Sequence, residues 1–229
     1  MLLFIHGTGA TPSTWLKQIR ATLSLDKSYT DKFILDTFTI KVPGHSGPDN
    51  NFTLPDIERK ITEFTKEKKE VQLELANKML LSDKREVVKI LRMERSVLVG
   101  HSFGGVACIN FSLKNAKSVA GLVLIGCGNK FSWPSLAMAR LNVFFLSKLS
   151  LSKLSFLVKI IPNTRWKIAI SIMEQNPNRR GLYSAIKIVR EHNFQKNFKL
   201  SSLYQQEQFC KLPILLINGR FDPLNRQRS

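Results

Sequence analysis

The sequence predicts an α/β protein whose core is a mostly parallel sheet with helices on both faces. Short apolar runs recur along the chain, helix-compatible segments separate most of them, and a serine flanked by glycines follows one of the runs. Each run is bounded by Gly, Pro or charge, as in strands buried on both faces. Strands that alternate with helices favour parallel pairing through right-handed crossovers. The expected strands are Leu2–Ile5, Phe33–Ile40, Ser96–Val99, Leu122–Ile125 and Ile214–Ile217.

Helical patterns fill the gaps between these runs. The expected helices are Thr14–Leu23, Leu54–Leu81 with a break, Lys84–Leu91 and Gly105–Lys114. The stretch 128–211 departs from the alternation and has the pattern of several amphipathic helices, with breaks at Pro162 and at 176–180. Examples are Leu136–Leu149, Lys153–Ile161 and Arg165–Glu174. We therefore expect a core formed by 1–127 and 210–229, with a helical lid inserted at 128–209.

The composition is that of a folded chain, and its charge is unusual. With 229 residues and 43% hydrophobic content, the chain can bury one sizeable core, which excludes a disordered tail or a disulfide mini-protein. The net charge is +18, and 128–211 holds 14 basic against 3 acidic residues, or +11 of that total. A solvated face explains this excess most simply. The segment lacks the regular Arg and aromatic spacing of a nucleic-acid reader, so no nucleic acid is expected as a partner.

Cysteine usage and hydropathy favour a soluble, cytoplasmic protein. Cys108, Cys127 and Cys210 are odd in number and form no C-x-x-C pair, so neither a disulfide framework nor a zinc site is indicated. The first residues lack the basic region of a signal peptide. The longest uncharged stretch, Ser96–Leu113, is interrupted by glycines and polar residues and is a poor membrane span. We expect no metal and no organic cofactor.

The serine lies in the motif Gly100-His101-Ser102-Phe103-Gly104-Gly105, which fits G-x-S-x-G. An apolar strand precedes it and a helix-compatible segment follows. A sharp strand-to-helix turn presents the serine oxygen at the carboxyl end of the sheet, and glycines on either side remove the Cβ atoms that would clash there. The helix N-terminus then faces the oxygen on which negative charge would develop.

Together with three other segments, this motif resembles the α/β-hydrolase superfamily. Leu2 to Gly9 looks like the family's strand and His-Gly oxyanion loop, and Leu35 to Gly47 looks like the next strand with its P-G-H-G-type turn. In that turn Ser46 stands where a second glycine is common. Leu212 to Pro223 resembles the late strand that ends in G-x-x-D. The resemblance covers nearly the whole chain and is least detailed in the insertion.

The resemblance implies roles for individual residues. Ser102 would be the nucleophile and Asp222 the acid of the triad, while the backbone N–H groups of Thr8 and Phe103 would form the oxyanion hole. The implied oxyanion loop contains His6 and Gly7. The implied nucleophile elbow, which is the strand-to-helix turn that presents Ser102, contains Gly100, His101 and Gly104. The implied activity is a serine hydrolase that cleaves a carboxylic ester, thioester or related small acyl compound, with an apolar pocket beneath the lid. As a simpler alternative, Asp222 is a turn residue before Pro223.

No histidine of the sequence occupies the position that the resemblance implies for the triad base. Family order is Ser, acid, His, but His6, His45, His101 and His192 all precede Asp222, and seven residues follow it. A crossover to another parallel strand needs about a dozen residues. We therefore expect a chain truncated at its C-terminus, with impaired catalysis. His192 could substitute from the lid, but a solvated surface residue is the simpler interpretation.

One alternative function remains open, together with an expectation about self-association. The chain could be a non-catalytic, degenerate binding protein of the same fold, with basic-lid contact to an anionic lipid surface. The stripe of Leu141, Phe144, Phe145 and Leu149 more simply packs over the pocket, so membrane contact is disfavoured. Ile214–Ile217 is expected to form an uncovered sheet edge, which would promote self-association.

Overall fold

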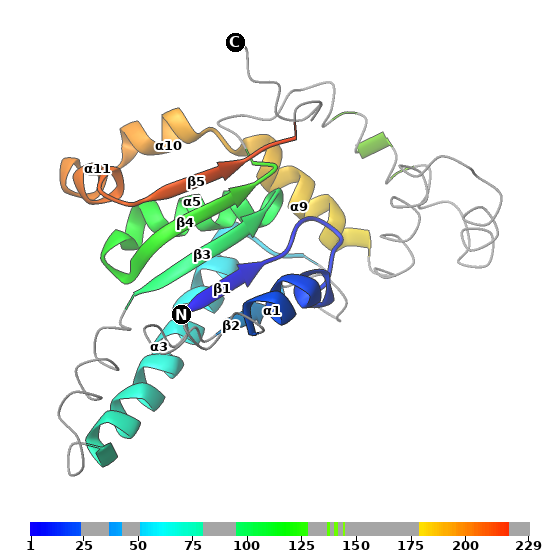
Figure 1. Ribbon diagram of the computed structural model, residues 1–229. Helices are drawn as coiled ribbons and strands as arrows, with labels where there is room; N and C mark the ends of the chain where they lie inside the picture. The colour runs from blue at the N-terminus through cyan, green and yellow to red at the C-terminus, as the bar shows by residue number, and fades with distance from the viewer. Residues whose placement is uncertain are drawn as a thin grey trace.

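The computed structural model describes most of the sheet and its neighbouring helices (Figure 1). The described residues are 1–23, 37–42, 51–79, 95–127, 137, 140–141, 144 and 179–219. They hold five strands, β1 (Leu2–Ile5), β2 (Thr37–Ile40), β3 (Ser96–His101), β4 (Val119–Ile125) and β5 (Ile214–Ile217). All neighbouring strands pair in parallel, in the order β2-β1-β3-β4-β5. The predicted α/β fold with a parallel sheet is confirmed.

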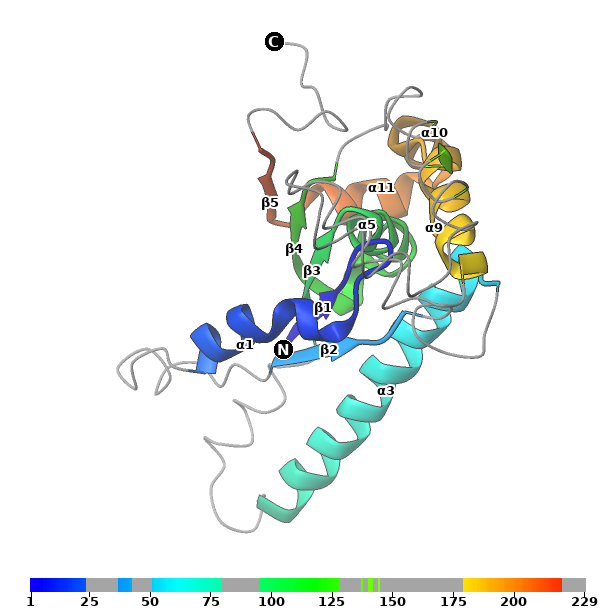
Figure 2. The same cartoon turned by 90° about the vertical axis from the view of Figure 1, so that its right-hand side faces the viewer.

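Helices cover both faces of this sheet. A 3-10 turn, η1 (Pro12–Trp15), leads into α1 (Leu16–Leu23) on one face, and α3 (Leu54–Met79) and α5 (Phe103–Asn115) lie on the other (Figure 2). A short turn, η3 (Ala116–Ser118), joins α5 to β4. Three further helices precede β5 and lie on the α5 side: α9 (Arg179–Glu191), α10 (Phe194–Leu200) and α11 (Leu203–Cys210).

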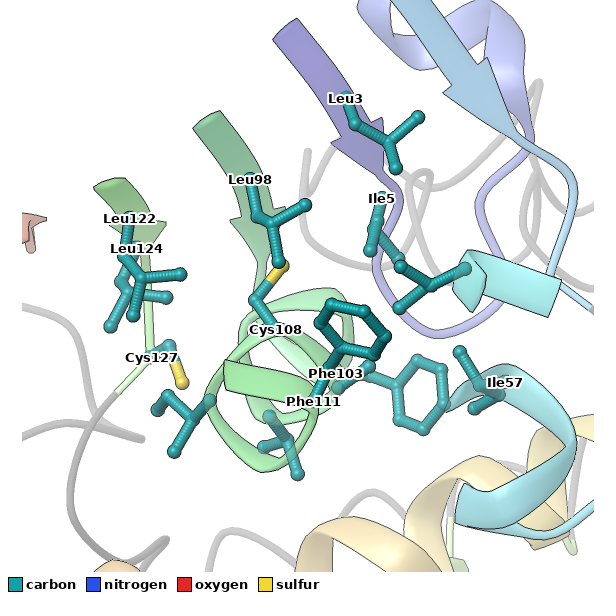
Figure 3. Close-up of a cluster of buried hydrophobic side chains, with 14 of the residues drawn as sticks. Leu3, Ile5, Ile57, Leu98, Phe103, Cys108, Phe111, Leu122, Leu124 and Cys127 are labelled. Atoms are coloured by element: carbon teal, nitrogen blue, oxygen red, sulfur yellow. The ribbon is translucent and has the colours of Figure 1, made fainter. Parts of the chain in front are cut away.

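The strands bury alternating side chains into two cores, because successive side chains point to opposite faces. The larger core joins the strands to α5, α3 and α9, and Figure 3 shows its strand residues pointing toward α5. These strand residues are Leu3, Ile5, Leu98, Leu122 and Leu124. The smaller core lies on the α1 face and is centred on Phe4, Trp15 and Val99. The rings of Phe4 and Trp15 are 5.0 Å apart in it.

Strand β5 is the exception, because every one of its side chains is exposed. It pairs with β4 on one side, and its four residues are about half exposed on both faces. The expected uncovered edge is therefore present among the described residues. Self-association through that edge stays a prediction.

Three helices need comparison with the sequence expectation, and one of them lies outside the described residues. The break expected in the second helix does not occur between Leu54 and Met79, where α3 is continuous. Helix α9 begins at the end of the expected break at 176–180, in agreement with the amphipathic helices expected in 128–211, although its bounds were not among the examples given. Its residues Leu182, Ala185, Ile186 and Val189 have helical spacing and are buried. The helix expected at Lys84–Leu91 lies outside the described residues.

The lid is described only in part. Residues 137, 140, 141 and 144 are helical, in agreement with the helix expected at Leu136–Leu149. The helices expected at Lys153–Ile161 and Arg165–Glu174 lie outside the described residues. Ala185 and Val189 of α9 belong to the larger core, so this part of the insertion packs on the sheet domain. The division into core and lid stays a prediction.

Candidate active site

The strand-to-helix turn around Ser102 has an unusual backbone. Strand β3 ends at His101, α5 begins at Phe103, and Ser102 between them has φ 51° and ψ −116°. These angles are close to those of the first central residue of a type II′ turn, a position that glycine dominates. The Ser102 N–H donates to the Ile125 carbonyl of β4 at 2.8 Å, and its own carbonyl accepts from Gly105 N–H at 2.9 Å. The turn is thus held in place by both the sheet and the helix.

Close backbone approaches explain the glycines on either side of Ser102. A Cβ at Gly100 would lie 2.6 Å from the Gly104 backbone. One at Gly104 would lie 2.2 Å from the Ile5 carbonyl oxygen. Real Cβ contacts are essentially never shorter than 3.0 Å, so a side chain at either position would push α5 away from β1 and β3. The small residues therefore allow the helix N-terminus to sit directly against the ends of two strands.

The loop after β1 reaches the same end of the sheet. It turns at Gly7–Ala10, where the Ala10 N–H donates to the Gly7 carbonyl at 3.2 Å and Gly9 has φ 74°, as the third residue of a type II turn requires. A Cβ on Gly7 would lie 2.7 Å from Nδ1 of His101. The His101 ring therefore packs on Gly7, which brings the loop and the elbow together.

His6 is buried and holds two strand ends together. The Val42 N–H, just after β2, donates to Nε2 of His6 at 3.1 Å, so Nε2 is an acceptor and the proton is on Nδ1. Nδ1 lies 3.0 Å from the Gly7 carbonyl, to which it donates. Both ring nitrogens are engaged in backbone contacts, which suits a neutral structural histidine rather than a base for Ser102.

The strand pairing brings the residues of the implied oxyanion donors to the same end of the sheet as Ser102. Strands β1 and β3 are neighbours, with Ile5 opposite Gly100. Thr8 lies three residues after Ile5, and Phe103 lies three residues after Gly100. The N-terminus of α5 adds a partial positive charge there, because the first peptide N–H groups of a helix point out of its end. The Phe103 side chain points away into the core and packs edge to face against Phe52, with ring centroids 5.7 Å apart, which fixes the first turn of the helix.

His192 is buried, contrary to the solvated position expected from sequence. Its ring is 3% exposed just after α9, where Nδ2 of Asn110 donates to its Nδ1 at 3.4 Å. The same amide donates to the Val106 carbonyl, and Nδ2 of Asn197 donates to Oδ1 of Asn110 at 2.9 Å. Asn110 follows Ser102 by eight residues, or about 12 Å along a helix. His192 therefore ties α9 to α5 and is not brought to Ser102.

A cavity of about 770 Å³ lies along this side of α5. Its walls come from the 51–55 segment, from Val106 and Asn110 on α5, and from α9 and the residues that follow it, with Arg140. It begins at Val106, about 6 Å along the helix from Ser102. Ser102 is not among its lining residues in the described part of the chain. The cavity therefore lies beside the elbow rather than over it.

Two buried thiols lie behind the elbow without facing it. Burial raises the pKa of Cys108, with a smaller contribution from Cys127, and burial raises the pKa of Cys127 to about 12. Cys127 packs against Gly105, where a Cβ would lie 2.7 Å from the Cys127 Cβ. Both thiols stay protonated at neutral pH and are therefore poor nucleophiles. Asp222 and His45 lie outside the described residues.

A family model described as the alpha/beta hydrolase family matches residues 2–195. The chain belongs to this family. No helix in the described part of this hydrolase-family chain is long and apolar enough to cross a lipid bilayer. No curated protein sequence matches the chain significantly.

Solved structures of other hydrolases share this fold at low sequence identity. A carboxylesterase of Nitrososphaera gargenis is 14% identical, with a TM-score of 0.52 over 95% of this chain and 81% of its own. The enol-lactonase of Burkholderia xenovorans LB400 is 12% identical, with a TM-score of 0.53 over 96% and 82%. E-2-(acetamidomethylene)succinate hydrolase is 15% identical, with a TM-score of 0.56 over 96% and 83%. At these identities the likeness concerns the fold alone.

Proposed function

We propose that the chain is a serine hydrolase that cleaves a small carboxylic ester, thioester or related acyl compound through an acyl-Ser102 intermediate. The observation that carries the proposal is the backbone of Ser102, a serine held in a glycine-like conformation between a strand and a helix N-terminus. Strain of this kind persists only where the surrounding structure imposes it, and it concentrates at functional sites. Small-molecule substrates are typical of the hydrolase relatives.

In the proposed reaction, Ser102 Oγ attacks the acyl carbon and the carbonyl oxygen becomes an oxyanion. The N–H groups of Thr8 and Phe103 would donate to that oxyanion, a device worth about 3 kcal/mol per donor in other hydrolases. The tetrahedral species then expels the alcohol or thiol, and water releases the acid. The cavity that begins at Val106 gives room for the part of the substrate that does not react.

The Ser102 proton needs an acceptor, and the described histidines are placed elsewhere. His6 is engaged at both ring nitrogens, His101 packs on Gly7, and His192 contacts Asn110. Without a positioned base the serine is a weak nucleophile, although binding and the oxyanion hole still give residual catalysis. We therefore propose that the described residues place no histidine base at Ser102, and that Asp222 serves as the acid of the triad.

Imidazole in solution tests this proposal, because a small base can diffuse to the position beside Ser102 that the described histidines leave empty. The assay follows hydrolysis of p-nitrophenyl acetate and p-nitrophenyl butyrate by the wild-type chain and by Ser102→Ala, each with and without imidazole. We expect slow turnover that imidazole accelerates in the wild-type chain beyond the free-solution reaction, and no such increment in Ser102→Ala. An equal increment in both proteins would contradict a serine nucleophile.

One observation favours the rival function, a non-catalytic binding protein of the same fold. The substitute base considered for Ser102, His192, is locked into a buried contact about 12 Å along α5. Under this alternative the nucleophile elbow has no catalytic role, and the wild-type chain turns over no faster than Ser102→Ala at any imidazole concentration. The same assay therefore separates the two functions.

A further inference from the structure

Two leucines project into water where α10 turns into α11. We call residues 194–211, together with Lys117 of η3, the α10–α11 corner. Leu200 is 75% exposed and Leu203 is 84% exposed, and Tyr204 beside them is 51% exposed. The two leucines are the most exposed large apolar side chains of the described residues. The corner lies at one end of the molecule in Figure 1, near the start of β5.

The corner is firmly held, so the exposure of its leucines does not come from a frayed helix. Beneath it the rings of Phe194, Phe198 and Phe209 pack against one another, with centroids 5.7 to 6.2 Å apart. In the turn, Ser202 and Gln205 form a reciprocal capping box that starts α11. Burying a leucine side chain is favourable, so packing within the chain does not explain why these two leucines are held in water on a rigid support. Exposed apolar groups of this kind mark interaction sites.

Lysines surround this apolar tip. Lys196, Lys199 and Leu200 have spacing i, i+3, i+4 and share the outer face of α10, where all three are exposed. On the other side, Nζ of Lys117 lies 5.2 Å from the ring centroid of Tyr204. The acidic residue of 194–211, Glu207, is paired with Lys211 at 2.5 Å. The corner therefore presents a net charge of +3 around exposed leucines and a tyrosine.

We propose that the α10–α11 corner is a docking site for an anionic lipid surface. Lysines attract anionic headgroups, leucine side chains enter the headgroup and acyl boundary, and Tyr204 suits that boundary because it has an apolar ring and a polar tip. Lysine is depleted at protein interfaces, which favours lipid over a protein partner here. Helices α10 and α11 are too short to span a bilayer, so contact would be peripheral and reversible.

The position of the corner sets the orientation of the docked chain. Lys117 lies two residues before the start of β4, so the corner lies at the amino ends of the strands, whereas Ser102 follows the carboxyl end of β3. Docking through the corner would therefore leave the elbow facing away from the lipid. The site would then act on substrates that reach it from water rather than on lipids of the same membrane.

Vesicle binding tests the proposal with a matched pair of variants. Lys199→Gln/Leu200→Ser removes one charge and one leucine from the corner. Leu16→Ser/Lys17→Gln removes the same two side-chain types from α1, where Leu16 is 48% exposed. Each protein is co-sedimented with vesicles of phosphatidylcholine alone and of phosphatidylcholine with phosphatidylglycerol. Circular dichroism and thermal melting confirm that both variants are folded, as expected for changes at exposed positions.

We expect the wild-type chain to bind the vesicles that contain phosphatidylglycerol and not those of phosphatidylcholine alone, and we expect added salt to weaken this binding. The corner variant should lose about fivefold from the missing charge and roughly tenfold from the missing apolar area, while the α1 variant binds like the wild-type chain. Equal loss of binding in both variants would mean that the chain is attracted to the vesicles non-specifically by its net charge of +18, and the proposal would fail.

Two further results would also overturn the proposal. The first is loss of binding in Leu141→Ser/Phe144→Ser with full binding in the corner variant, which would assign lipid contact to the lid. The second is no binding to either kind of vesicle, together with corner-dependent retention on immobilised polyglutamate. That result would assign the lysines to an acidic protein partner.

Discussion

Replacing Ser102 by glycine should stabilise the folded chain while removing the proposed nucleophile. The backbone of Ser102 has φ 51° and ψ −116°, a region in which a Cβ atom is strained and a glycine is not. The surrounding structure imposes this conformation through the 2.8 Å hydrogen bond from Ser102 N–H to Ile125. Ser102→Ala keeps the Cβ and hence the strain, and it therefore serves as the matched control.

The expected gain follows from two opposing contributions. A residue held in such a region costs about 1 to 3 kcal/mol, which glycine would recover. Glycine also gives the unfolded chain more freedom, at a cost of roughly 0.5 to 1 kcal/mol. The difference leaves Ser102→Gly about 1 kcal/mol more stable than Ser102→Ala. For a chain of this size, that difference raises the melting temperature by about 2 to 4 °C.

Urea unfolding followed by tryptophan fluorescence and by circular dichroism measures this difference. Coincident transitions from the two probes would justify a two-state treatment, and equal slopes would show that the denatured states are comparable. We expect a higher midpoint for Ser102→Gly than for Ser102→Ala, with Ser102→Ala close to the wild-type chain. A glycine variant no more stable than the alanine variant would refute the strain at the elbow.

Three further predictions concern the packing around the site and the sheet edge. Gly104→Ala should lower the free energy of unfolding by about 3 kcal/mol, because its Cβ would lie 2.2 Å from the Ile5 carbonyl oxygen; an unchanged urea midpoint would contradict this close approach. Leu216→Lys on β5 should weaken concentration-dependent association in size-exclusion chromatography, and identical elution of variant and wild type across concentrations would argue against a role for this edge. Because burial raises the pKa of Cys127 to about 12, a thiol reagent should modify the exposed Cys210 and leave Cys127 intact. Stability from that buried thiol is present at neutral pH and should fall above about pH 9, where the unfolded thiol ionises first, and a urea midpoint independent of pH there would count against it.

The strands could be predicted because their patterns are local. β1 and β5 begin and end at the residues expected, and β3 and β4 contain the expected runs with a few added residues. Each run is apolar on both faces and bounded by Gly, Pro or charge, so its strand character can be read without knowing its partners. The burial that the same pattern predicts is wrong for β5, which lies at the edge of the sheet with its side chains about half exposed. The elbow could be predicted for the same reason, because Gly100, Ser102 and Gly104 lie within five residues and their constraint is steric.

The positions of the histidines could not be predicted, because they depend on contacts between distant segments. His192 was expected in water from its neighbour Glu191, whereas its position is fixed by Asn110, 82 residues earlier. The clamp formed by His6 and Val42 likewise spans 36 residues. The exposed leucines of the α10–α11 corner were missed for a related reason, since their exposure depends on which side of each helix packs on the aromatic cluster.

The most direct test of the central claim is the site of covalent modification by a fluorophosphonate. Such a probe bonds to an activated serine oxygen, and peptide mass spectrometry identifies the modified residue. We predict a single adduct on Ser102, formed slowly, accelerated by imidazole and absent from Ser102→Ala. An unmodified Ser102 after prolonged exposure with imidazole present would contradict the account and leave the chain as a binding protein with a hydrolase fold.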